Sequence, residues 1–93
     1  MSRYDDSMIL IGKKPLMQYV MAAVLNLNTD QKVVTIRARG NAISVAVDCA
    51  EVVRNKFSRD SVLEKVSIGT DSLPRKDGSQ SKVSWIEIVL RRP

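Results

Sequence analysis

The chain has 93 residues, 44% of them hydrophobic and 27% charged, a globular composition with room for one domain and a modest core. Lys and Arg number 15 against 10 Asp and Glu, and the net charge of +5 favours polyanionic partners. Histidine is absent and Cys49 is the only cysteine, which removes the commonest general base and any metal site built from cysteines.

The first predicted elements are a strand and a helix. Residues 7–11 form an apolar run that ends at Gly12, as expected for a buried strand. From Leu16 the apolar residues recur at i, i+4, i+7, i+8 and i+11, which predicts an amphipathic helix that ends near residues 26–30. Pro15 suits the first turn of this helix, because its missing N–H would have no partner there.

A second strand and a second helix follow. Residues 32–39 are rich in β-branched side chains and alternate between two faces, so they predict a strand. Gly40 interrupts it, and Asn41 is a good N-cap for the next helix. One face of that helix carries six apolar residues that we expect in the core: Ile43, Ala46, Val47, Ala50, Val53 and Phe57.

Residues 63–70 and 83–90 predict the last two strands. Between them, residues 73–82 lack the periodicity of a core element and contain the turn signal Asp77-Gly78, so we expect a protruding basic hairpin loop. The core residues of these strands are expected to be Val66, Ile68, Ile86, Ile88 and Leu90. The order is βαβαββ. It predicts a single α/β domain over residues 1–93, in two layers, with a four-stranded mixed sheet and two helices.

The sequence contains few residues that could support an enzymatic function. Cys49 lies between core positions of the second helix, where a cysteine is usually a small buried hydrophobe. Asp48 and Glu51 form an acidic pair typical of a solvated helix face, and no phosphate-cradling glycine loop is present. We expect no enzyme, no cofactor, no metal and no small-molecule substrate. The chain has no apolar run long enough to span a bilayer, no signal peptide and no lipidation motif, so we expect no membrane contact and a cytoplasmic protein.

Three basic groups indicate a polyanion site. Lys13 and Lys14 precede a helix whose free N–H groups attract phosphate. Arg37 and Arg39 share a strand face roughly 7 Å apart, close to the phosphate spacing of a nucleic-acid strand. The third group lies in the predicted hairpin loop and can follow a groove: Arg75, Lys76 and Lys82. A solvated lysine pair, arginines paired with carboxylates and an ordinary charged loop remain the alternatives.

The aromatic residues argue against a stacking platform for single strands. In the sequence they are not interleaved with basic residues: Tyr4, Tyr19, Phe57 and Trp85.

Six blocks of the sequence, taken together, indicate a resemblance to a known family. They are residues 11–20 (IGKKPLMQYV), 36–44 (IRARGNAIS), 46–48 (AVD), 51–57 (EVVRNKF), 68–69 (IG) and 83–88 (VSWIEI). Together they resemble the Alba family of archaeal DNA- and RNA-binding chromatin proteins, and the resemblance spans almost the whole chain. The resemblance implies a fold similar to the C-terminal domain of translation initiation factor three. It also implies a homodimer that binds double-stranded DNA, and often RNA, with little sequence preference.

The resemblance also implies roles for particular residues. The expected nucleic-acid-binding positions are Lys13, Lys14, Arg37, Arg39, Asn41, Arg75, Lys76 and Lys82. Lys13 matches a lysine that is acetylated in some members, and Phe57 matches an aromatic through which dimers pack side by side on DNA. Asn41 and Val45 depart from the family pattern, because basic residues are frequent at both positions. The binding surface of each dimer would therefore lack up to four positive charges.

The function expected from all this is sequence-independent coating and compaction of chromosomal DNA by a homodimer. The alternative is an RNA-binding protein, either an RNA chaperone or a ribonucleoprotein subunit. A third reading is a protein–protein adaptor whose charge only confers solubility.

Overall fold

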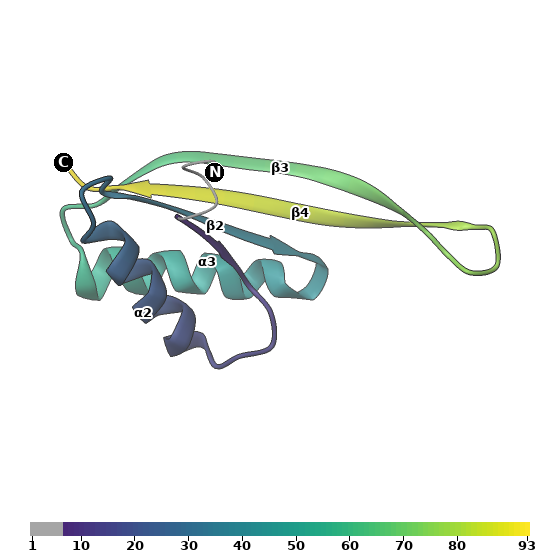
Figure 1. The fold of residues 1–93 in the computed structure, drawn as a ribbon, viewed down its shortest axis with the longest axis horizontal. Helices are drawn as coiled ribbons and strands as arrows, with labels where there is room; N and C mark the ends of the chain where they lie inside the picture. Colours follow the sequence, from purple (N-terminus) through teal and green to yellow (C-terminus); the bar gives the residue numbers. More distant parts are fainter. Residues whose placement is uncertain (1–6) are drawn as a thin grey trace.

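Four strands form one mixed sheet in the computed structural model, which describes residues 7–93 (Figure 1). β1 (Met8–Leu10) runs parallel to β2 (Val33–Arg39), and β2 pairs antiparallel with β4 (Gln80–Arg91). β4 pairs antiparallel with β3 (Val62–Pro74), so the order across the sheet is β1-β2-β4-β3. The parallel pair at one edge makes the sheet mixed, as the sequence predicted.

The helices cover one face of this sheet (Figure 1). α2 (Leu16–Leu27) connects the parallel strands β1 and β2. After the short 3₁₀ turn η1 (Gly40–Ala42), α3 (Ile43–Val52) packs on β2 and β4. The helix widens into a π-type last turn, η2 (Val53–Phe57), where the Ser58 N–H donates to the Val53 carbonyl at 2.7 Å. Two helices over a four-stranded sheet confirm the predicted fold class.

The core lies between the helices and the two central strands. Ile36 faces Ile88 across β2 and β4, and Ala38 faces Ile86, so the predicted alternation of both strands is confirmed. Seven large side chains are fully buried: Val20, Leu27, Val34, Ile36, Cys49, Val53 and Leu90. They come from both layers, and their burial removes the apolar faces of α2, α3, β2 and β4 from water.

Four residues predicted for the core are exposed instead. On α3 and η2 these are Val47 and Phe57; on β3 they are Val66, which is 49% exposed, and Ile68, which is 78% exposed. For Val66 and Ile68 the reason is the position of β3, which forms the edge of the sheet beyond the strands that α3 covers. Periodicity identified their apolar face correctly but could not indicate that this chain leaves it uncovered.

The predicted loop over residues 73–82 is shorter than expected. β3 continues to Pro74 and β4 begins at Gln80, so the turn comprises only residues 75–79. Ladder hydrogen bonds, which need no core-forming periodicity, extend both strands. The Asp77 carboxylate accepts hydrogen bonds from the N–H and hydroxyl of Ser79, and Gly78 takes the left-handed conformation that the turn requires. The resulting hairpin projects well beyond the body (Figure 1).

The predicted N-cap at Asn41 is wrong. Gly40 adopts φ of +56°, and Asn41 lies inside η1, where its side chain makes no cap hydrogen bond. α3 therefore begins only at Ile43.

Pro15 stands directly before α2, where it accepts a hydrogen bond from the Gln18 N–H. Within residues 7–93, no helix is long and apolar enough to cross a membrane.

Candidate nucleic-acid interface

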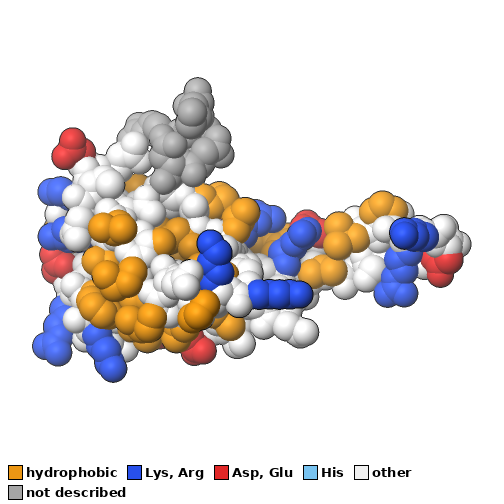
Figure 2. Space-filling view, turned by 60° about the horizontal axis from the view of Figure 1, so that its bottom comes forward, with side chains coloured by type: hydrophobic (Ala, Val, Ile, Leu, Met, Phe, Trp, Pro, Cys, Tyr) orange, Lys and Arg blue, Asp and Glu red, His pale blue; other side chains and the backbone are white. Residues whose placement is uncertain are grey.

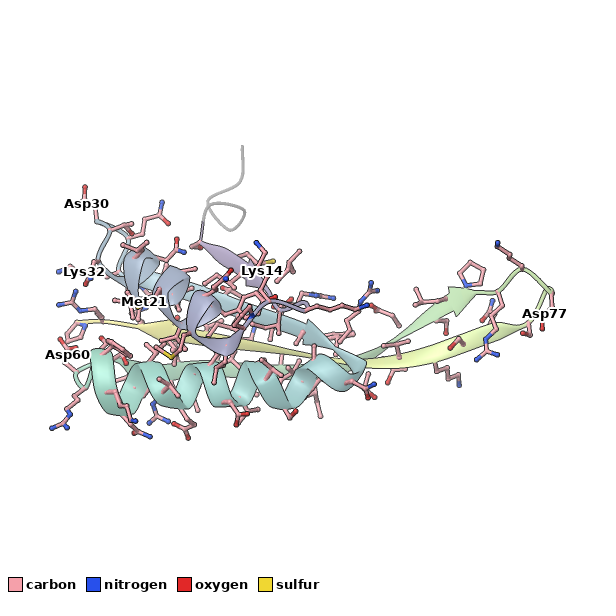
Figure 3. All side chains as sticks on the ribbon, turned by 90° about the horizontal axis from the view of Figure 1, so that it is seen from below. Lys14, Met21, Asp30, Lys32, Asp60 and Asp77 are labelled. Atoms are coloured by element: carbon pink, nitrogen blue, oxygen red, sulfur yellow. The ribbon has the colours of Figure 1, made fainter. Side chains whose placement is uncertain are left out.

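The turn that carries the lysine pair is fastened to the body by one hydroxyl. Tyr19, buried on α2, accepts hydrogen bonds from the N–H of Gly12 at 2.8 Å and of Lys14 at 3.0 Å. Both lysines are exposed, and Lys14 lies closer to the hairpin than Lys32 and Met21 do (Figure 3). These two amides precede α2 and are therefore not the helix N–H groups that the sequence predicted for phosphate; the Tyr19 hydroxyl holds the turn that carries the two lysine ammonium groups.

The lysine turn and the arginine strand lie at the same end of the sheet. β1 and β2 are parallel, Leu10 is in register with Arg37, and the Ile11 N–H donates to the Arg37 carbonyl at 2.9 Å. The chain leaves β1 toward Lys13 where β2 reaches Arg39. A hollow of about 520 Å³ at these strand ends is lined by Leu10, Ile11, Arg37, Ala38 and Arg39. The fold therefore places two basic groups that are far apart in the sequence at the same end of the paired strands β1 and β2.

Both arginines face carboxylates on neighbouring strands. Arg37 donates a short hydrogen bond to Glu87 on β4, and Arg37 Nη2 lies 4.0 Å from Asp71 Oδ2 on β3. Arg39 Nη1 lies 3.8 Å from the same Asp71 oxygen. Pairing with carboxylates was the alternative that the sequence left open, and it describes both side chains. Sequence reasoning did not single out Asp71 or Glu87, because only the strand order reveals them as neighbours of the arginines.

The structure also corrects the expectation that aromatic and basic residues are separate. Trp85 on β4 is in register with Arg39, and the guanidinium of Arg37 lies over its ring, 4.8 Å from the ring centroid. Gly69 on β3 lies opposite Trp85, where a Cβ would come within 2.3 Å of the ring. Trp85 is therefore held between a glycine and an arginine, in a cation–π arrangement that sequence spacing does not indicate.

The third basic group lies along the hairpin, with every member exposed: Arg75, Lys76 and Lys82. Basic side chains are visible both at the root of the hairpin and near its tip (Figure 2). Asp77 lies between them at the tip (Figure 3), and hydrogen bonds from the Ser79 hydroxyl and N–H hold its pKa below the usual value. This carboxylate stays ionised and organises the turn.

The remaining predicted positions lie outside this group of side chains. Asn41 is exposed in η1, Val45 is half-buried against the core, and Phe57 is exposed at the far end of the α3–η2 helix. Cys49 is fully buried, as predicted, and burial raises the pKa of its thiol to about 11. Among the described residues, no cluster of Asp, Glu and Cys could hold a metal ion.

Comparison with known proteins decides the family. The family model described as Alba matches residues 8–70, which is more than half of the chain and includes both the lysine turn and the arginine strand. The chain belongs to the Alba family. Alba is a non-enzymatic family, so the prediction that this chain is not an enzyme is confirmed.

Individual Alba proteins agree with this assignment. A protein from Methanocella arvoryzae named "DNA/RNA-binding protein Alba" is 49% identical over 89 residues, which cover 96% of this chain and 93% of the relative. The solved structure of Alba from Thermoplasma volcanium is 45% identical and matches with a TM-score of 0.84, covering 91% of this chain and 99% of that one. An Alba protein from Trypanosoma brucei, 23% identical with a TM-score of 0.75, covers 94% of this chain and 69% of that one; it shares the fold.

Proposed function

We propose that this Alba protein is a homodimeric nucleic-acid-binding protein that coats and compacts chromosomal DNA without reading its sequence. The observation that carries the proposal is that exposed basic side chains lie on the body, at the root of the hairpin and near its tip (Figure 2), although others lie at the opposite end of the body. Lysine and arginine at such positions contact phosphates, which are the same at every base pair. The name of the Methanocella relative supports the same class of ligand.

The division into body and arm suits a duplex. Lys13 and Lys14 would contact the phosphate backbone at the body, while the arms, with Arg75, Lys76 and Lys82, would reach along the minor groove. Lys13 is exposed and would be open to acetylation, which would remove one of these charges. Association with the chromosome in the cytoplasm follows from this proposal.

Salt dependence tests the proposal directly. With about six phosphate contacts per dimer, log K should fall with log[salt] with a slope on the order of −5. The double substitution Lys13→Ala and Lys14→Ala should weaken binding to every duplex about equally, and should make the slope shallower by about 0.9 for each phosphate that the variant no longer neutralises. The dissociation constants of several unrelated duplexes, measured over a range of salt concentrations, check both outcomes.

A charge-matched control separates local contact from net charge. Lys32 lies at the opposite end of the body (Figure 3), and Lys56 is exposed on η2. Lys32→Asn with Lys56→Ala removes the same two charges per chain; asparagine tolerates the positive φ of Lys32. This control should change affinity much less. A loss as large as that of the Lys13 and Lys14 variant, or a loss confined to one sequence, would contradict backbone contact at the lysine turn.

RNA is the second candidate ligand, because the Methanocella relative is named for both nucleic acids. The protein would then act as an RNA chaperone or a ribonucleoprotein subunit. Competition between equal lengths of duplex DNA and structured RNA for a limiting amount of protein distinguishes the two roles. Preferential retention of RNA would favour this second candidate.

A homodimer is proposed because β3 carries apolar side chains that this chain leaves in water. Val66 and Ile68 are in register with the core residues Ile88 and Ile86, so they point to the helix side of the sheet. Val47 is exposed on α3. A second copy that packs here would bury these side chains and would place two arms in one particle. Phe57, 46% exposed at the end of η2, would remain available for contacts between dimers on DNA.

A further inference from the structure

We propose that Asp71 is a built-in competitor of phosphate, whose carboxylate occupies Arg37 and Arg39 and so limits the affinity of this protein for nucleic acid. The proposal rests on the proposed function and concerns the root of the arm. Three adjacent strands supply the cluster: the arginines from β2, Glu87 from β4 and Asp71 from β3.

The geometry makes Asp71 a shared and displaceable partner. Its Oδ2 lies 4.0 Å from Arg37 Nη2 and 3.8 Å from Arg39 Nη1, longer than the 2.7–3.2 Å of a hydrogen bond. The Asp71 side chain is 36% exposed and that of Arg39 is 52% exposed. Water and a ligand phosphate can therefore reach both groups. A phosphate oxygen at hydrogen-bonding distance from Arg39 would form a shorter contact than Asp71 does.

Arg37 is held differently. It donates directly to Glu87, its side chain is only 29% exposed, and its guanidinium lies over the ring of Trp85. Glu87 neutralises Arg37 and the indole ring restricts its movement, so Arg39 is the arginine that a phosphate can take over. Asp71 is the only carboxylate among the described residues that forms an ion pair with Arg39.

The charges of the cluster cancel while Asp71 is in place. Two guanidinium groups face two carboxylates, so a cluster that the sequence presents as two positive charges carries none. A phosphate that binds Arg39 must also approach the negative charge of Asp71. Removing that charge should strengthen binding at this point and should allow each protomer to neutralise one more phosphate, with its release of counterions.

The test is Asp71→Asn in the full chain, with dissociation constants for one duplex measured between about 50 and 200 mM salt. We expect affinity to rise about tenfold per dimer at low salt, because each exposed ion pair of this kind is modest and the dimer contains two. The salt slope should become steeper by about 0.9 for each additional phosphate that is neutralised. Trp85, the only tryptophan, reports movement of Arg37 through its fluorescence.

Glu64→Gln is the matched control, because it removes the same charge elsewhere. Glu64 accepts a hydrogen bond of 2.6 Å from Arg91 near the start of β3, at the other end of that strand from Asp71. This variant should change affinity less than about twofold. Arg39→Ala in the Asp71→Asn background provides a double-mutant cycle, in which the gain should disappear. Thermal unfolding of each variant verifies that it folds.

Each outcome decides the proposal. A gain for Asp71→Asn that exceeds the control and depends on Arg39 supports it. An equal gain for both variants would mean that only net charge matters, and weaker binding by Asp71→Asn would mean that Asp71 positions the arginines; either result overturns it. If the wild-type protein binds duplex DNA and Asp71→Asn does not differ from it, this proposal alone fails. If neither protein binds any nucleic acid at low salt, the proposed function fails as well.

Discussion

The Tyr19 hydroxyl links the core of the protein to its lysine pair. The ring is buried on α2, while its oxygen accepts hydrogen bonds from the Gly12 and Lys14 amides. A buried anchor of this kind reduces the conformational entropy that a flexible lysine turn would lose when it binds phosphate. The position of the two ammonium groups is therefore set by a side chain that need not touch the ligand.

Tyr19→Phe tests this link with a minimal change. The ring still fills its site, but two amides lose their acceptor, so we expect a loss of about 1–2 kcal/mol in unfolding free energy. Amide hydrogen exchange at Gly12 and Lys14 should become faster, and affinity for a DNA duplex should fall severalfold. Exchange measured by NMR and binding by fluorescence anisotropy check these expectations. Unchanged exchange at both amides would contradict the anchoring role.

At the scale of elements, β3 and β4 form one long hairpin with two roles. The part next to the body pairs with β2 and supplies core residues from β4, whereas the outer part projects and carries basic side chains. Gly69 on β3 lies against the Trp85 ring at the junction between the two parts. The absence of a side chain at Gly69 lets the indole lie across the strand, where it supports Arg37.

Gly69→Ala should disturb this junction. The added Cβ would lie 2.3 Å from the indole, so Trp85 must move and overpacking should cost about 1–3 kcal/mol of unfolding free energy. The fluorescence of Trp85 should change in the folded state as the ring leaves Arg37. Ser67→Ala, on the same strand, serves as the control and should stay within about 0.5 kcal/mol of wild type. Wild-type fluorescence and stability in Gly69→Ala would refute this packing argument.

At the scale of the whole molecule, the chain exposes large apolar side chains on both α2 and β3. Helix α2 exposes Met17, Met21 and Leu25 at helical spacing, and Met21 is visible on its outer side (Figure 3). β3 exposes Val66 and Ile68, at an edge strand that presents unpaired backbone groups as well. β1, the other edge strand, exposes one large apolar side chain, Leu10, whereas β3 exposes several along its open edge, so we expect the dimer to form at β3.

Ile68→Asp should separate the dimer into monomers. A charge at this position cannot be buried against a second copy without a large desolvation cost, so the dimer dissociation constant should rise by at least about tenfold. Leu25→Asp makes the same chemical change on α2 and should leave the dimer intact. Sedimentation velocity without nucleic acid distinguishes the two species. A monomeric wild type, or dissociation by Leu25→Asp alone, would show that β3 is not the interface.

The sequence predicts an element well when the apolar periodicity of that element comes from burial within this chain. Periodicity in β2, β4 and α2 comes from burial within one chain, and these elements were predicted closely. Val47 and Ile68 have the same periodicity, yet both are exposed, because their burial is not completed within this chain. Asn41 has a good capping side chain, but the left-handed conformation of Gly40 starts a 3₁₀ turn first. The capping preference of Asn41 therefore did not determine where the helix begins, because the backbone conformation at Gly40 did.

By itself, the sequence determined the fold class, the Alba resemblance and the three basic groups, because residue type, spacing and periodicity are properties of a linear chain. Only the tertiary structure decided which charges remain available. The strand order places Asp71 beside Arg39 and Glu87 beside Arg37, although more than 30 residues separate each pair along the chain. Electrostatic interaction depends on distance through space, so a pair of arginines that reads as two free cations becomes a balanced cluster once the sheet forms.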